Sequence, residues 1–292
     1  MCKWLAATAA VLGLMGAVAF ADPPSSSNAG PTKLDPVAVE SSSRNPRINP
    51  QVSEFVSSVA MPVQHESMAR WSVQVCVFAA GLLPNEGDFV QRRIASVASE
   101  AGISVGPAGC QTNFVVVVTS EPEAFLRDWW HEEPKLFNRE RGVAGVERTI
   151  LTDRPVRVWH NVCNAPPALA RNYHLNAQWD CNTGTLGSRI TRVAVRSIYS
   201  AIVVVDFRKI EGLTWGQVGD YVAMVGLAQL RMDAETGAVP TILNLFDDGG
   251  DERAKALTVW DQAFLKSVYA SREGSVTELA QIKLKMTEDL AR

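Results

Sequence analysis

The sequence predicts an α+β fold in which a mixed β-sheet packs against helices. Three observations support this prediction. Strand-like and helical patterns alternate in the first half of the chain, the run Phe-Val-Val-Val-Val at 114–118 is too β-branched for a helix, and residues 213–292 carry helical signals only. The strands and helices of the first half are therefore expected to form one layered core, with a helical part at its C-terminal end.

Residues 1–21 have the pattern of a cleavable secretory signal peptide. Lys3 precedes an apolar run over residues 4–20, and Ala19-Phe20-Ala21 forms a cleavage site before Asp22. We expect a mature chain that works in the periplasm or is secreted, with no membrane span after signal cleavage.

The rest of the chain is expected to hold one globular domain. Residues 22–49 are rich in Ser, Pro and Asn, which is typical of a flexible lead, and residues 50–292 follow as a single domain. The hydrophobic fraction of 47% is enough for a sizeable core. The net charge is −3 and no Lys/Arg run is present, so we expect no nucleic-acid partner.

Four cysteines remain after signal cleavage, which favours two disulfides in an exported chain. Sequence alone permits three pairings, and we favour Cys76 with Cys110 and Cys163 with Cys181, because each pair joins neighbouring parts of the chain. A zinc site of four cysteines would need close C-x-x-C pairs, and the sequence has none.

Hydrophobic periodicity predicts alternating elements in the first half of the chain, followed by an irregular charged stretch to about residue 153. The predicted order is helix, strand, helix, strand, helix, over residues 50–59, 71–78, 84–101, 113–119 and 121–130.

The second half is predicted to contain a strand pattern over residues 155–162 and another over residues 192–208, the latter broken near Arg196-Ser197 into a hairpin. Capping boxes then predict three helix starts. The three pairs are Thr214 with Gln217, Thr258 with Asp261, and Ser275 with Glu278.

No complete catalytic motif is present in the sequence. His131 is followed by Glu132, but Lys135 stands where H-E-x-x-H needs its second histidine. The letters G-x-S-x-G occur at 102–106, but a helix precedes them where the nucleophile elbow requires a strand. Ser104 is therefore expected to be an ordinary loop residue.

His160, His174 and Asp180 are the remaining candidates for chemistry. They lie on either side of Cys163 in a polar segment and would supply imidazole and carboxylate ligands if the loop brought them together. One hypothesis is a hydrolase whose site is assembled from these side chains, with Asp220 as a further member. The plainer reading is loop hydrogen bonding or surface exposure.

The segment from 198 to 269 resembles an uncharacterised family of exported bacterial proteins with a zincin-like metallopeptidase fold. In that family a strand leads to a helix with the site residues and then to a Gly-Leu turn. A short Ser/Thr-Ile-Phe-Asn-like stretch follows, and then a helix with an aspartate near its start and Leu-Tyr near its end. The matching segments here are residues 201–205, 219–223, 226–227, 241–246 and 258–269.

The resemblance implies a site that has lost its metal ligands. Aligned on Gly226-Leu227, Gly219 and Asp220 occupy the positions that a zincin fills with His and Glu, and Ala223 the position of the second His. The resemblance therefore implies a non-catalytic protein without a cofactor. Such a protein would bind a protein or peptide of the cell envelope at the edge strand beside the site helix.

Overall fold

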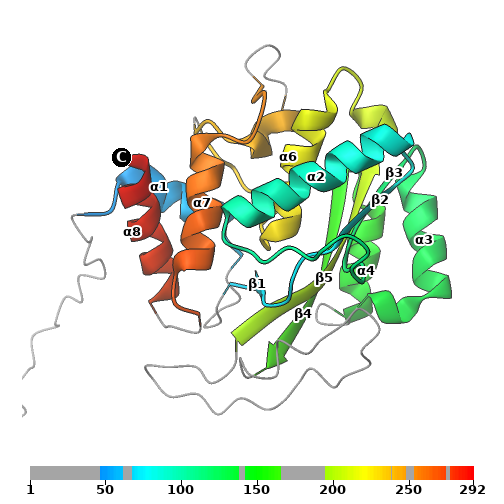
Figure 1. Cartoon of the computed structure of the whole chain (residues 1–292), viewed down its shortest axis with the longest axis horizontal. Helices are drawn as coiled ribbons and strands as arrows, with labels where there is room; N and C mark the ends of the chain where they lie inside the picture. Colours follow the sequence, from blue (N-terminus) through cyan, green and yellow to red (C-terminus); the bar gives the residue numbers. More distant parts are fainter. Residues whose placement is uncertain are drawn as a thin grey trace, which may run out of the picture. The chain divides into compact units, whose positions relative to one another are not determined.

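The centre of the fold is a long strand, β5 (Val195–Asp206), which has neighbours on both sides in a five-stranded sheet (Figure 1). β3 (Phe114–Thr119) and the short β1 (Arg70–Trp71) run parallel to it. β2 (Val77–Ala80) extends the sheet beyond β3, again in parallel. β4 (Val156–Ala165) pairs with the opposite side of β5 and is antiparallel. The sheet is thus mostly parallel with one antiparallel edge strand.

The computed structural model of the chain confirms the α+β class. Contacts within the chain group Arg44–Arg292 into one compact unit. The residues that the structure describes are 47–61, 68–137, 142–165, 195–237, 239–247, 253–273 and 277–292. The predicted signal peptide, most of the predicted lead, and His174, Asp180 and Cys181 lie outside these ranges.

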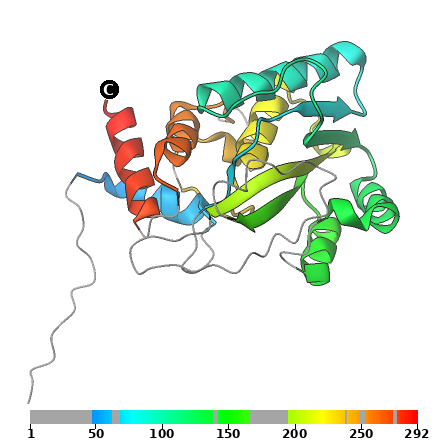
Figure 2. The same ribbon diagram turned by 60° about the horizontal axis from the view of Figure 1, so that its bottom comes forward.

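Side chains of the sheet alternate between two apolar clusters, as expected for strands covered on both faces. On β3, Phe114, Val116 and Val118 belong to the larger cluster, and Val117 belongs to the smaller. The helices divide in the same way (Figure 2). The larger cluster includes α2 (Pro84–Glu100) and α6 (Trp215–Leu227), whereas the smaller one includes α3 (Pro122–Glu132) and α4 (Gly142–Leu151).

Three further helices continue the larger cluster beyond the sheet: α1 (Pro50–Val59), α7 (Val259–Ala270) and α8 (Glu278–Leu290). The ring of Phe55 contacts Trp260 and Phe264 edge-to-face, with centroids 5.7 and 5.9 Å apart. Such pairs contribute about 1 kcal/mol each beyond burial. The start of the domain is therefore fixed to its C-terminal helices.

Two of the three predicted capping boxes are confirmed. Thr214 with Gln217 opens α6, and Thr258 with Asp261 opens α7. The third pair includes Ser275, which lies outside the described residues, so this box stays a prediction. Helix α8 begins at Glu278, and the carboxylate of Glu278 pairs with the buried guanidinium of Arg70.

Three other predictions about the elements need correction. The strand predicted over 71–78 is two short strands, β1 and β2, and the hairpin predicted over 192–208 is one continuous strand, β5. The stretch before residue 153 contains α4, which the sequence analysis missed. Short 3-10 turns complete the described elements: η1 (Pro134–Leu136), η2 (Phe207–Lys209) and η3 (Ile242–Phe246).

A disulfide joins Cys76 to Cys110, as predicted, with the two Cα atoms 6.0 Å apart. It ties the start of β2 to the loop that precedes β3. Cys163 on β4 is also disulfide-bonded. Its predicted partner Cys181 lies outside the described residues, so that pairing stays a prediction.

Candidate functional site

Helix α6 carries the three positions that the resemblance assigns to lost zinc ligands. Gly219, Asp220 and Ala223 are all buried. A Cβ atom at Gly219 would lie 3.4 Å from the aliphatic part of Arg93 on α2. Gly219 therefore lies against α2, where a Cβ would make an ordinary van der Waals contact with Arg93.

The carboxylate of Asp220 is held by structural partners. Arg93 donates two hydrogen bonds to it, the longer at 3.0 Å, and the main-chain N–H of Leu257 donates a third at 2.7 Å. The side chain of Asp220 is 1% exposed and that of Arg93 32% exposed. The hydrogen bond to Asp220 raises the pKa of Arg93 above its ordinary value. Asp220 thus joins three segments of the chain.

A zinc ion does not fit these helix positions. Two side chains one turn apart would have to supply nitrogen, sulfur or oxygen ligands, and Gly219 and Ala223 supply none. The carboxylate of Asp220 is already bound by a guanidinium. Within the ranges that the structure describes, no three His, Cys, Asp or Glu side chains are grouped as a metal site.

His160 lies on strand β4, within the strand pattern predicted over residues 155–162, and not in the loop that was expected to hold it with His174 and Asp180. Its Nε2 atom is 3.1 Å from the carbonyl oxygen of Gly226, which also accepts a hydrogen bond from the indole N–H of Trp71 at 3.0 Å. His160 and Trp71 therefore contact the same main-chain carbonyl at the C-terminal end of α6. His174 and Asp180 lie outside the described residues, so their convergence with His160 remains a prediction.

Two of the segments that carry the family resemblance, residues 226–227 and 258–269, meet at this end of α6. The hydroxyl of Tyr269 on α7 donates to the carbonyl of Leu227, next to Gly226. Burial raises the pKa of Tyr269 well above its ordinary value. The last carbonyls of α6, which have no partner within the helix, are thus bound by side chains from elsewhere in the fold.

The outer edge of β4 has main-chain groups that face away from the sheet. Asp206 donates its N–H to the carbonyl of Pro155 at 2.8 Å, and in an antiparallel pair the residues that face the partner strand alternate. Val156 and Val158 therefore direct their N–H and C=O groups outward. Among the described residues, none bonds to these outward groups.

A groove of about 190 Å³ lies beside this edge. One side is formed by α4 and the turn into β4, and the other by residues 230–233, which follow α6. The described lining residues are Met61, Arg148, Thr149, Thr152, Arg154, Val156, Arg157, Val158, Leu230, Arg231, Met232 and Asp233. The groove thus combines apolar side chains, arginines and an exposed strand edge.

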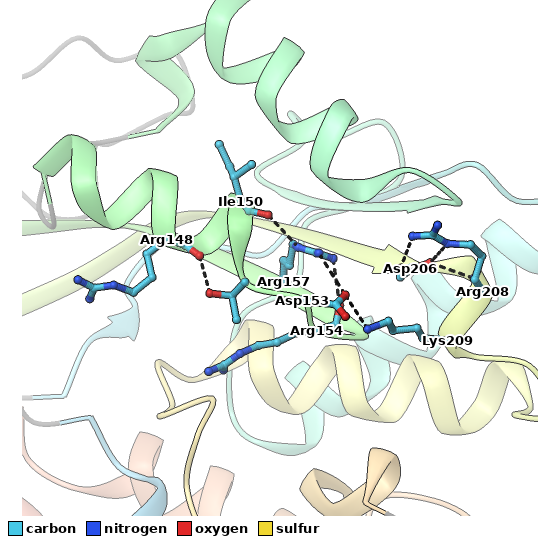
Figure 3. A network of polar contacts seen from close by, with 9 residues as sticks. Arg148, Ile150, Asp153, Arg154, Arg157, Asp206, Arg208 and Lys209 are labelled. Carbon is cyan, nitrogen blue, oxygen red and sulfur yellow. Dashed lines mark hydrogen bonds and ion pairs between the residues drawn. The ribbon is translucent and has the colours of Figure 1, made fainter.

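Arg157 orders the wall of the groove formed by α4. Its guanidinium donates to the carbonyls of Ile150 at 3.2 Å and Arg154 at 3.0 Å, and lies 3.9 Å from the carboxylate of Asp153 (Figure 3). Burial lowers the pKa of Arg157 from its ordinary value. The carboxylate of Asp153 also accepts a hydrogen bond from Lys209, with the Nζ atom 2.6 Å away. This hydrogen bond lowers the pKa of Asp153.

Arg148 and Arg154 differ from Arg157 because no carboxylate in the described part of the chain pairs with them. Figure 3 shows both side chains extending away from Asp153 and toward the same side. Their charge is therefore available to a ligand in the groove.

The free edge of β2 has a second groove, of about 470 Å³, bordered by α2 and the loop of the Cys76–Cys110 disulfide. The main-chain carbonyl of Cys76 accepts a hydrogen bond from the N–H of Phe114 on β3, so Cys76 faces the inside of the sheet. Because successive residues of a strand alternate, Val77 and Ala79 direct their main-chain groups outward. Its described charged residues, Asp88 and Arg92, balance each other. This groove is not beside α6.

The sequence analysis missed the arginines of the β4 groove. Arg148 and Arg154 lie about 80 positions before Arg231, and no local spacing connects them. Arg148 lies on α4, a helix that the sequence analysis did not predict, so this wall of the groove was not expected.

Comparison of the chain with models of protein families, with curated proteins and with solved structures finds no match. The helices of the described ranges are each too short or too polar to cross a bilayer. The function is therefore argued from the geometry of the chain itself.

Proposed function

We propose that this chain is an exported, non-catalytic, zincin-like protein of the cell envelope that binds a protein or peptide partner as an added strand along β4. The observation that carries the proposal is the outward main chain of Val156 and Val158, which has no partner among the described residues and borders a groove. An edge of this kind is a template for an extended segment.

The position of β4 supports a zincin-like reading. In zincins the bound peptide pairs with an edge strand beside the site helix. Here β4 is the antiparallel edge strand, and His160 on β4 lies against Gly226 at the end of α6. The mode of binding needs main-chain groups and side-chain pockets, and it does not need a metal.

The side chains at the former site positions favour binding over catalysis. Gly219 packs on Arg93, and the carboxylate of Asp220 is bound by Arg93 and Leu257. A general base must be free to take a proton from water, and the carboxylate of Asp220 is already bound by Arg93 and Leu257. The disulfide between Cys76 and Cys110 supports a place outside the cytoplasm.

The test selects peptides from a displayed random library on the intact chain and then compares two proline variants. Val158→Pro removes an outward N–H from β4, and Val77→Pro removes an outward N–H from β2. Proline is tolerated at edge positions whose N–H faces solvent. We expect Val158→Pro to weaken binding of the selected peptides at least about tenfold and Val77→Pro to leave it unchanged.

Three results would overturn the proposal: no selected peptide, equal binding by both variants, or a loss confined to Val77→Pro. Thermal unfolding of each variant shows whether it is folded. If Val158→Pro does not fold, amide hydrogen exchange of the unaltered chain with and without peptide decides the question, because it needs no substitution.

A further inference from the structure

We infer that the β4 groove selects an acidic segment, whose carboxylates are bound by Arg148, Arg154 and Arg231. This inference rests on the proposed strand addition and names the chemistry of the partner. Its basis is the charge of the groove, the absence of ion-pair partners for that charge among the described residues, and the positions of the arginines on both walls.

The groove is positive although the chain is not. Its described lining includes four arginines and one aspartate, Asp233, whereas the whole chain has a net charge of −3. The β2 groove has one arginine and one aspartate. The positive charge of the groove is opposite in sign to that of the whole chain, so it does not follow from the overall composition. Such a groove favours a negatively charged partner.

Three of the four arginines have side chains that form no ion pair within the described ranges. Arg157 is buried and donates to two main-chain carbonyls, so its role is structural. Arg148 and Arg231 are exposed, Arg154 is half-buried, and none of them has an ion-pair partner in the described ranges. A guanidinium binds a carboxylate with two parallel hydrogen bonds, which makes these side chains suitable for Asp and Glu.

The arginines lie on both sides of the edge strand. Arg148 and Arg154 come from α4 and the turn that follows it, and Arg231 comes from the segment after α6. An added strand presents successive side chains to opposite faces. Acidic residues at neighbouring positions would therefore meet arginines on opposite walls, while the main chain pairs with Val156 and Val158.

The experiment measures binding of labelled peptides of about ten residues to the intact chain. In these peptides, pairs of neighbouring Glu, Gln or Lys residues alternate with pairs of Thr, so that both faces of an added strand carry the tested side chain. We expect the Glu peptide to bind about tenfold more tightly than the Gln peptide at low salt, and the Lys peptide to bind most weakly. The difference should shrink as salt screens the exposed arginines.

Charge-reversal variants assign the effect to the groove. Arg154→Glu should remove most of the preference for Glu over Gln and should improve binding of the Lys peptide. Arg92→Glu is the matched control, since Arg92 is an exposed arginine in the β2 groove. It should leave the affinities within about twofold of the parent chain.

The outcomes separate this inference from the proposed function. If Glu and Gln peptides bind equally and Val158→Pro weakens both, strand addition stands and the acidic preference is wrong. If Arg92→Glu removes the preference and Arg154→Glu does not, the acidic segment binds elsewhere and the inference is overturned. If no peptide of the series binds, the inference fails, and the library selection alone decides the proposed function.

Discussion

The main-chain N–H of Leu257 donates a hydrogen bond to the carboxylate of Asp220 at 2.7 Å, and Arg93 binds the same carboxylate from α2. One side chain of α6 thus holds the segment before α7 and the helix that covers the sheet. At the position that the resemblance aligns with the general base of a zincin, this chain has a structural carboxylate.

Asp220→Asn should therefore lower stability. The variant leaves the guanidinium of Arg93 without its carboxylate, and we expect the free energy of unfolding to fall by about 2 kcal/mol. Urea denaturation measures this loss. Asp88→Asn is the control, because Asp88 is exposed on the same helix as Arg93. An Asp220→Asn variant as stable as the parent would show that the carboxylate is not a structural anchor.

Gly226→Ala should be strongly destabilising. A Cβ at Gly226 would lie 2.2 Å from the ring of Phe114, which is stacked on Trp71 and cannot move freely. We expect a loss of about 2–3 kcal/mol from overpacking. In the same helix, a Cβ at Gly216 meets its nearest neighbour at 3.6 Å, so Gly216→Ala should be neutral or stabilising by up to about 1 kcal/mol. Equal thermal midpoints for the two variants would contradict the packing account.

Asp206 should make stability depend on pH in the acid range. Its hydrogen bonds from Arg208 lower the pKa of the carboxyl in the folded state. Stability from the charged form is therefore present above the pKa of the unfolded chain, about 3.8, and is lost as pH falls through the lower folded value. In the Asp206→Asn variant the side-chain amide oxygen can still accept a hydrogen bond from the main-chain N–H of Arg208, but the side chain has no charge.

The stability difference between the parent chain and Asp206→Asn should accordingly be largest near neutral pH and should shrink below about pH 4. Denaturation at a series of pH values measures it. A difference that stays constant or grows on acidification would contradict the assignment.

Removal of the Cys76–Cys110 disulfide should destabilise the domain. The bond closes a loop with a sequence separation of 34, which corresponds to about 3–4 kcal/mol in the chain-entropy model. We expect the double variant with alanine at both positions to unfold at a lower temperature by several degrees or more. A thiol count of the parent chain checks that these two cysteines are oxidised, and unchanged stability would contradict a structural role for the bond.

Local signals explain the elements that could be predicted. The run Phe-Val-Val-Val-Val became β3, because β-branched side chains suit a strand covered on both faces. The Thr214 and Thr258 capping boxes marked the starts of α6 and α7, since the cap bonds form within four residues.

The predictions that failed depend on distant contacts. The pairing of the Glu278 carboxylate with Arg70, more than 200 positions earlier, has no local sequence signal. β5 is unbroken at Arg196-Ser197 because β1 and β4 pair with this part on either side. The sequence pattern there contains polar residues and does not show these neighbours.

The candidate site was predictable only in part. Gly219, Asp220 and Ala223 could be located on a helix from the capping box, but the binding of Asp220 by Arg93 and Leu257 joins three separate segments. The free edge of β4 is a property of strand order, because Val156 and Val158 have a pattern that would suit a central strand equally well. The arginine groove likewise exists only once α4 and residues 230–233 face each other.

The most direct test of strand addition is amide hydrogen exchange at Val158, measured on the intact chain with and without a selected peptide. The account predicts that the amide of Val158 exchanges readily in the free chain and slows at least about tenfold when the peptide is bound, while Val77 on the other free edge is unchanged. Slowing at Val77 without slowing at Val158, or no change at either amide in the presence of a bound peptide, would contradict it.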